Sequence, residues 1–200
     1  MYRVYGMLTS GNCYKVYLTL KQLGQPFEWI HTDIMKGESR TTEFLARNPN
    51  GRVPALEIAP GKYLAESNAI LCYLAEGTPL LPTDRYERAQ VLQWLFFEQY
   101  SHEPYVAVAR FIKVFLGNPP DRATDLAKCM QRGTQALGVM EQHLATGDFF
   151  VAQRYTVADI ALYAYTHVAH EGGFDLTKYP HLGNWLRRVK SRPGHVTMHG

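Results

Sequence analysis

The stretch of sequence that decides the fold is Asn48-Pro-Asn-Gly-Arg-Val-Pro-Ala-Leu-Glu57. Its Val53-Pro54 step runs directly into an apolar strand, although proline lacks an N–H and stands normally at the first residue or the edge of a strand. We therefore expect a strand to begin near Pro54. A cis Val53–Pro54 bond would turn the N–H and C=O of Val53 outward, where they could pair with an extended, peptide-like ligand.

The segment Ala65-Glu-Ser-Asn68 comes shortly after that strand and opens an apolar helix with Ile70, Leu71 and Leu74. The first N–H groups of a helix have no partner within the helix, and together with the helix dipole they attract a carboxylate. Ser67 could donate or accept there, and Glu66 suits an amino group. The two motifs together predict a receptor for a small zwitterion. Either motif alone could be an ordinary strand start or helix cap.

Composition excludes several classes of function. The chain has 200 residues, 46% hydrophobic and 20% charged, with a net charge of +3. That charge is spread over both halves, so nucleic acid and membrane surfaces are not expected partners. The longest apolar runs fall short of a bilayer span. The three cysteines are odd in number and far apart, which indicates a reducing compartment, by default the cytoplasm.

The first half of the chain predicts a βαβ unit followed by a ββα unit. Strands are expected over residues 2–8 and 27–32, on either side of a helix that Ser10 or Asn12 could cap. A crossover helix between two strands implies a parallel pair. A hairpin around Pro60-Gly61 and a helix over residues 66–76 complete this domain, assigned to residues 1–77.

The second half of the chain predicts helices throughout. The segment Gly77-Thr-Pro-Leu-Leu-Pro82 marks a boundary, so we assign residues 78–84 to a linker and 85–200 to an all-helical domain. A long helix starting at Asp84 is expected to bend near Pro104. The Thr156-Val-Ala-Asp159 signature predicts a capped helix that is apolar nearly all round and therefore central to this domain.

This ordered set of features resembles the cytosolic glutathione transferases, and bacterial members allied to the theta, beta and nu groups most of all. The resemblance covers essentially the whole chain. It implies a thioredoxin-like N-terminal domain (βαβ–ββα) followed by an all-helical C-terminal domain. It also implies a homodimer, with glutathione as co-substrate and a small hydrophobic electrophile as second substrate.

The resemblance carries over to particular positions. Val53, before Pro54, would pair with the cysteinyl backbone of glutathione, and Glu66 and Ser67 would hold its γ-glutamyl group. Arg40 and Arg52 stand where related enzymes carry basic residues for the glycyl carboxylate, and Lys36 could substitute for them.

Activation of the glutathione thiol requires a further group, because a free thiol with a pKa of about 8.5 is only a few per cent thiolate at neutral pH. Ser10 lies in the turn that matches the serine of theta-like enzymes and is the first candidate. Asn12 is the second, since its amide could donate to sulfur, although it could also be a plain helix cap. Cys13 is weaker: the first sulfur of a Cys-x-x-Cys pair is missing. Tyr5 lies inside the first strand and does not match a tyrosine-type site.

The second substrate is expected between the two domains, against the long helix, with Tyr105 and Arg110 as pocket residues. His102, Glu103 and Gln99 could reach the γ-glutamyl amine of a neighbouring subunit. The eight histidines form no close ligand cluster in the sequence, so no metal is expected.

Three functions remain open at this point. The first is conjugation of glutathione to electrophiles. The second is glutathione-dependent reduction of disulfides or peroxides, and the third is a non-enzymatic interaction protein with the same fold.

Overall fold

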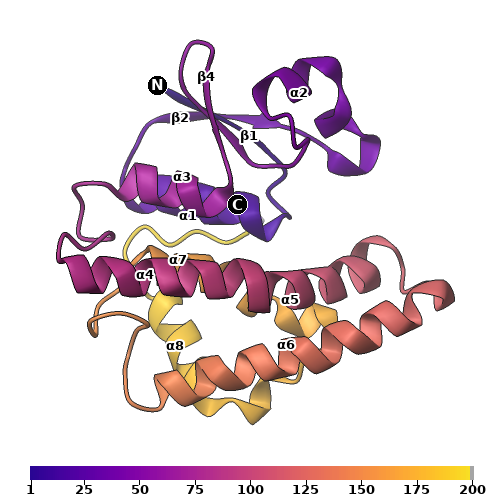
Figure 1. Ribbon diagram of the computed structural model, residues 1–200, viewed down its shortest axis with the longest axis vertical. Helices are drawn as coiled ribbons and strands as arrows, with labels where there is room; N and C mark the ends of the chain where they lie inside the picture. Colours follow the sequence, from indigo (N-terminus) through magenta and orange to yellow (C-terminus); the bar gives the residue numbers. More distant parts are fainter. Residues whose placement is uncertain (199–200) are drawn as a thin grey trace. The chain divides into compact units, whose positions relative to one another are not determined.

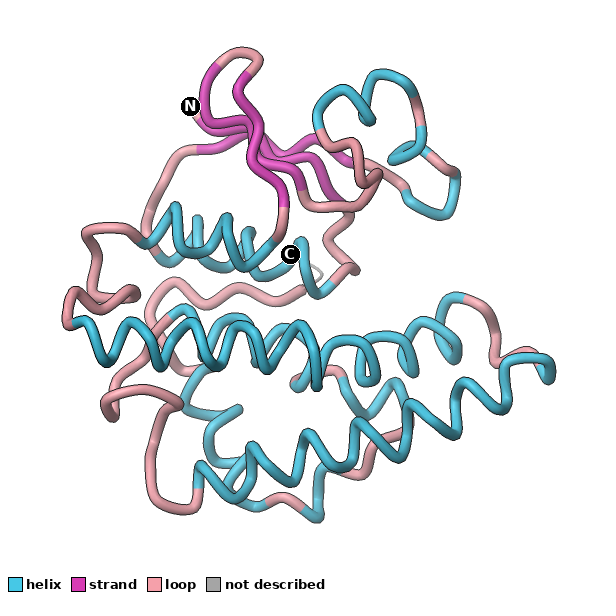
Figure 2. Tube along the Cα trace, in the orientation of Figure 1, coloured by secondary structure: helices cyan, strands magenta, loops and turns pink. Residues whose placement is uncertain are grey.

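The computed structural model describes residues 1–198, which form two compact units. The first unit spans Met1–Thr78 and includes residues 193–198, and the second spans Pro79–Arg192. Figure 2 shows the strands gathered in the first unit and the second unit as helices joined by loops. The thioredoxin-like domain and the helical domain expected from the sequence are thus both present.

The first unit is built on a four-stranded sheet with the order β2-β1-β3-β4. The strands are β1 (Tyr2–Gly6), β2 (Phe27–His31), β3 (Ala55–Ala59) and β4 (Lys62–Ala65). β1 and β2 are parallel, whereas β3 runs antiparallel to both β1 and β4. This confirms the predicted βαβ–ββα order, in which a crossover helix makes the first strand pair parallel.

Helices cover both faces of this sheet because successive strand residues point to opposite faces. The helices are α1 (Gly11–Gln22), α2 (Thr42–Arg47) and α3 (Ser67–Ala75). Val4 of β1 packs with Val16 and Ile70, so α1 and α3 lie side by side on one face (Figure 1). Its neighbour Tyr5 packs with Phe44, which places α2 on the other face. The starts of α1 and α3 are thereby brought together.

The second unit is helical, as predicted. Its α-helices are α4 (Arg85–Phe97), α5 (Glu103–Arg110), α6 (Ala123–Leu144), α7 (Val157–Thr166) and α8 (Pro180–Lys190). Two π-helical turns, Glu98–His102 and Phe111–Phe115, precede and follow α5. Short 3-10 turns complete the chain at Ile34–Lys36, Glu38–Arg40, Pro120–Arg122, Ala169–Gly172 and Leu176–Lys178. Among residues 1–198, no helix combines the length and the apolar character needed to cross a bilayer.

Near Pro104, where the sequence predicts a bend, the helix passes through a π-helical turn. Pro104 stands in the first turn of α5, directly after Glu98–His102. Proline has no N–H to continue the regular ladder, and a wider turn accommodates that loss.

The last residues of the chain return to the first unit, whereas the sequence assigned them to the helical domain. α8 ends at Lys190, and Pro193 and Gly194, with φ of +71° at the glycine, follow within four residues. The buried Tyr14 of α1 then donates its hydroxyl to the carbonyl of Val196 at 2.7 Å. Met198 is only 2% exposed. Contacts with α1 thus hold the tail.

Helix α7 is the centre of the second unit, and all its residues are buried. The predicted cap is present as a capping box between Thr156 and Asp159. The carboxylate of Asp159 also accepts hydrogen bonds from Trp185 Nε1 at 2.9 Å and from the Phe150 N–H at 3.2 Å. One buried side chain therefore joins α7, α8 and the loop before α7.

Asp159 gives a testable pH dependence. Burial raises its pKa to about 6, against about 3.9 in an unfolded chain. Between those values the folded state binds more protons, so the free energy of unfolding falls as the pH rises from about 4 to about 6. Asp159→Asn removes this titration. In urea unfolding, the stability of the wild type relative to Asp159→Asn should therefore drop, by an amount on the order of 2 kcal/mol, between pH 4 and pH 7. A relative stability that rises over this interval would contradict the assignment.

Candidate functional site

The start of α1 carries both candidate thiol-activating residues. Ser10 occupies the N-cap position with extended backbone angles, but its side chain makes no capping hydrogen bond. Its N–H closes the preceding turn on the Met7 carbonyl at 2.9 Å. Asn12 lies inside the first helical turn. The preceding turn, and not a side-chain capping bond, therefore places Ser10 at the N-terminal end of α1.

The start of α3 is strained. Glu66, at its N-cap, has φ of 67° and ψ of 109°, a combination that non-glycine residues rarely adopt. Such strain costs about 1–3 kcal/mol and persists where the surrounding structure imposes it, commonly at functional sites. The Glu66 side chain is exposed, whereas the next residue, Ser67, is buried. The strained backbone thus separates an outward carboxylate from an inward hydroxyl at the same helix end.

A hydrogen-bond network joins the two helix starts. Ser67 Oγ donates to Asn12 Oδ1 at 3.1 Å. Lys15 of α1 is fully buried, and its ammonium donates to Asn12 Oδ1 at 2.8 Å, to Asn68 Oδ1 at 3.3 Å and to Ser67 Oγ at 3.4 Å. The structure thus links Asn12 directly to Ser67, two residues that the sequence placed in separate subsites of one receptor.

The peptide bond between Val53 and Pro54 is cis, as predicted. Pro54 is buried and Val53 is half-buried, with its side chain in the cluster around Tyr5. β3 begins only at Ala55, whose partner in β1 is Tyr5. The main chain of Val53 therefore lies just beyond the end of the β1–β3 ladder.

Arg40 and Arg52 both lie at the loop that leads to this cis bond. Arg40 donates to the carbonyl of Asn50 at 3.1 Å and lies against Gly51, whose φ is +62°. Arg52 is exposed, and its carbonyl accepts from Asn48 Nδ2 at 2.7 Å. Lys36, the possible substitute, is exposed and pairs with Asp33 at 3.5 Å. Arg40, from the Glu38–Arg40 turn, thus contacts the loop at Asn50 and Gly51, and Arg52 is part of that loop.

Cys13 and Tyr5 are parts of the core. The Cys13 side chain is fully buried against Gly6, and burial raises the pKa of its thiol to about 12. Tyr5 donates its hydroxyl to the carboxylate of Glu57 at 3.1 Å, and burial raises the pKa of Tyr5 as well. Neither side chain is set up to activate a second thiol at neutral pH.

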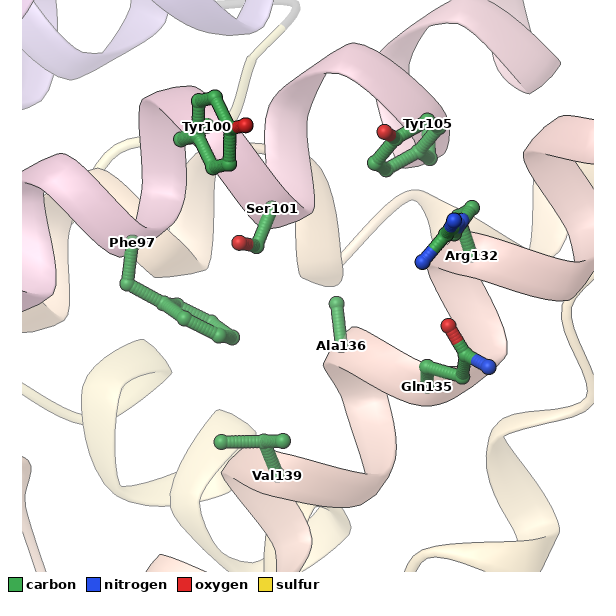
Figure 3. A pocket seen from close by; sticks show the side chains of 8 residues that line it. All are labelled: Phe97, Tyr100, Ser101, Tyr105, Arg132, Gln135, Ala136 and Val139. Atoms are coloured by element: carbon green, nitrogen blue, oxygen red, sulfur yellow. The ribbon is translucent and has the colours of Figure 1, made fainter.

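The candidate pocket residues of the second unit have different surroundings. Tyr105 lines a cavity of about 300 Å³ between the long helix and α6, together with Phe97, Tyr100, Ser101, Arg132, Gln135, Ala136 and Val139 (Figure 3). Arg110 is buried and pairs with Glu171 at 2.6 Å. His102 is also buried, with Nε2 3.0 Å from the Thr166 hydroxyl. The pocket roles of Tyr105 and Arg110 stay predictions.

Sequence reasoning missed Lys15 and Asn68. Lys15 follows Asn12 by three residues, a spacing that places both on one face of a helix. Lys15 also lies among apolar residues of α1. Its spacing from Asn12 was therefore the one signal in the sequence that this lysine is buried. Within residues 1–198, no group of three or more histidine, cysteine, aspartate or glutamate side chains is arranged to hold a metal ion.

The strain at Glu66 gives a second prediction. Glu66→Gly should raise the free energy of unfolding by about 0.5–2 kcal/mol, because relief of about 1–3 kcal/mol of strain exceeds the roughly 0.5–1 kcal/mol of extra chain entropy that glycine loses on folding. Glu66→Ala removes the same carboxylate but keeps the Cβ, so its stability should stay near that of the wild type. Urea unfolding of the three proteins checks this; equal stability of the glycine and alanine variants would refute it.

Two family models match the chain. The model described as glutathione S-transferase, N-terminal domain, matches residues 1–76. The model described as glutathione S-transferase, C-terminal domain, matches residues 98–193.

Solved structures and curated proteins agree with these models. A crystal structure of glutathione S-transferase from Pseudomonas fluorescens [Pf-5] is 54% identical, with a TM-score of 0.98, and covers 100% of this chain and 99% of that chain. Ure2p in complex with glutathione is 27% identical, with a TM-score of 0.87, over 96% of this chain and 95% of that chain. The disulfide-bond oxidoreductase YfcG of Escherichia coli (strain K12) is 32% identical over 91% of this chain and 87% of its own length. The chain belongs to the glutathione S-transferase family.

Proposed function

We propose that this protein is a cytoplasmic glutathione transferase, which conjugates the thiolate of glutathione to small hydrophobic electrophiles. The observation that carries the proposal is the joined pair of helix starts, with Asn12 bonded to Ser67, beside the cis Val53–Pro54 bond. The names of the Pseudomonas fluorescens structure and of the glutathione complex of Ure2p support glutathione as the ligand.

Each part of glutathione has a proposed partner in the first unit. The N–H and C=O of Val53 pair with the cysteinyl backbone, as an added strand would. The γ-glutamyl carboxylate binds at the start of α3, where the Ser67 hydroxyl and the first N–H groups favour an anion. Glu66, exposed beside it, takes the γ-glutamyl amine. Arg40 and Arg52 flank the glycyl carboxylate.

The chemical step is attack of the glutathione sulfur on an electrophilic carbon, with the leaving group expelled and the thiol proton released to solvent. Lowering the thiol pKa from about 8.5 by about two units requires roughly 2.7 kcal/mol of selective stabilisation of the thiolate. Hydroxyl and amide donors at a helix N-terminus are suited to this. We assign this role to Ser10, with Asn12 as a second donor.

Tyr105 and Arg110 are proposed for the electrophile pocket. The cavity that Tyr105 lines is about 300 Å³, within the size range of small-ligand sites, and its walls carry aromatic rings and an arginine. Arg110 is held by Glu171, so its contribution would be to fix the Gly172 turn that packs on its main chain. Tyr105 is therefore the residue we expect to touch the second substrate.

The test of the proposal is conjugation of glutathione to chlorodinitrobenzene. The wild type should bind glutathione, detected as a shift in melting temperature, and should turn over. Ser10→Ala should lower kcat tenfold or more at neutral pH, because its bound thiol loses a donor, while the dissociation constant for glutathione changes less. Ser191→Ala, at an exposed serine, is the control and should match the wild type. Absence of glutathione binding by the wild type would refute the proposed function. Normal turnover of Ser10→Ala would show that Ser10 has no catalytic role.

Glutathione-dependent disulfide reduction is the second candidate, supported by the name of the relative YfcG and by the amide at Asn12. The same protein preparation distinguishes the two reactions when assayed with a small model disulfide in place of the electrophile. Disulfide reduction faster than conjugation would favour this candidate. Glutathione binding with neither activity would favour a non-enzymatic interaction protein.

A homodimer is proposed from a stripe of exposed, large apolar side chains on the long helix. Leu92, Phe96 and Tyr100 recur every four residues and are 39%, 69% and 83% exposed. Large apolar side chains gathered on one face usually mark an interface. The exposed Val139 of α6 lines the cavity beside Tyr100 and extends the surface.

Phe96→Glu should therefore convert a dimer into a monomer, since a buried carboxylate without a partner is expensive. Sedimentation equilibrium of the wild type and the variant measures this. Val114→Glu, at another exposed apolar residue of the same unit, should remain dimeric. A monomeric wild type, or a dimeric Phe96→Glu variant, would exclude this surface.

A further inference from the structure

The cavity that Tyr105 lines, about 300 Å³ in volume, carries one kind of charge. Of the eight described residues that form its walls, Arg132 of α6 is the only charged one. The residues three and four positions from Arg132 on α6 are Lys128, Cys129, Gln135 and Ala136. None of these helical neighbours is acidic, so neither the walls nor the adjacent turns of α6 supply a carboxylate to balance the guanidinium.

Two packed helices bring the walls of the cavity together. One face of α6, with residues three or four positions apart, supplies Arg132, Gln135, Ala136 and Val139. The long helix supplies three residues at a spacing of four, Phe97, Ser101 and Tyr105, and also Tyr100. Because α5 packs against α6, the two rows face each other across the cavity (Figure 3).

The two ends of the cavity differ in their chemistry. Figure 3 shows Arg132, Gln135 and Tyr105 toward one end, and Phe97 and Val139 toward the other. A guanidinium, an amide and a phenol can all donate hydrogen bonds, whereas the ring and the aliphatic side chain cannot. The arrangement thus suits a ligand with an apolar, flat body and one anionic group at its end.

The group that fits the polar end best is a carboxylate. A guanidinium presents a planar fork of N–H groups, which matches the two oxygens of a carboxylate with two parallel hydrogen bonds. The Gln135 amide and the Tyr105 hydroxyl could add a donor each. Arg132 and Gln135 are exposed, so water screens the attraction and its contribution to affinity is modest.

On this basis, and resting on the proposed function, we propose that the second substrate is an aromatic electrophile that carries a carboxylate, which Arg132 binds at the polar end of the cavity. The glutathione sulfur forms a bond to the ring carbon that bears the leaving group, and that group departs with the electron pair of the broken bond. The carboxylate is unchanged by the reaction and only holds the substrate. An arginine that served solubility alone would not distinguish such a substrate from its neutral ester.

The experiment compares para-chlorodinitrobenzoate, with a nitro group on each side of the chlorine, and its methyl ester. The two substrates share the ring and the leaving group and differ in charge. Each kcat/KM is divided by the rate constant of the uncatalysed reaction with glutathione, which removes the difference in intrinsic reactivity. Both are measured on one preparation, because Tyr100 and Val139 also belong to the proposed dimer surface.

The wild type should prefer the acid over the ester by about fivefold, the effect of an exposed ion pair, and mainly through a lower KM. Arg132→Met should abolish this preference. Lys128→Met is the matched control, since it removes the same charge one turn away from an exposed position of the same helix, and it should keep the preference. A wild type without the preference, or a preference that survives Arg132→Met, would overturn the proposal.

Gln135→Glu tests the same site with Arg132 in place. The new carboxylate lies three residues from Arg132 on α6, where it can pair with the guanidinium and repel the carboxylate of the substrate. The preference for the acid should therefore disappear. An undiminished preference in this variant would place the anion elsewhere and contradict the role of Arg132.

Binding of dinitrobenzoate without the chlorine separates this inference from the proposed function. This probe has no leaving group, so its calorimetric titration requires no conjugation. It should bind the wild type more tightly than Arg132→Met, and equal affinities would overturn the inference even where chlorodinitrobenzene is conjugated. Binding that depends on Arg132, in a protein that binds no glutathione, would support the carboxylate site and refute the proposed function.

Discussion

The contact on which the site depends is the hydrogen-bonded junction between the starts of α1 and α3. Asn12, Lys15 and Ser67 are distant in the chain, and the packing of both helices on one face of the sheet brings them together. The core beneath them is apolar and requires no particular polar residue. Packing of α1 and α3 on the same face thus brings the partly positive N-terminal ends of two helices together. Such a pair of ends suits a ligand with more than one anionic group.

The sequence was most informative where a residue type has one narrow structural use. A proline ahead of an apolar strand indicated the cis bond at Val53–Pro54, and Thr156 with Asp159 indicated the capping box. The parallel pairing of the first two strands followed from the crossover rule. These features are local, or depend on general rules of connectivity, and a single sequence contains them.

The features that the sequence did not reveal depend on contacts between distant segments. Lys15 reads as a surface lysine until α3 is placed over it, and Asn68 reads as an ordinary residue of a first helical turn. The tail after Pro193 has no periodic pattern, and only its contact with Tyr14 assigns it to the first unit. The strain at Glu66 is equally invisible, since glutamate gives no sign of a positive φ. In each case, the identity of the residue was known but its partner was not.

Two of the buried polar centres, around Asp159 and around Lys15, differ in what they hold together. Around Asp159, hydrogen bonds from Thr156, Phe150 and Trp185 converge on one carboxylate and hold three elements together. Around Lys15, a buried ammonium group donates to side-chain oxygens of both α1 and α3, next to a strained backbone at Glu66. The first arrangement joins elements of the second unit, and the second joins the starts of α1 and α3. The second arrangement lies where the γ-glutamyl carboxylate is proposed to bind, so the polar contacts that fasten the two helices also fix the helix start proposed to receive that ligand.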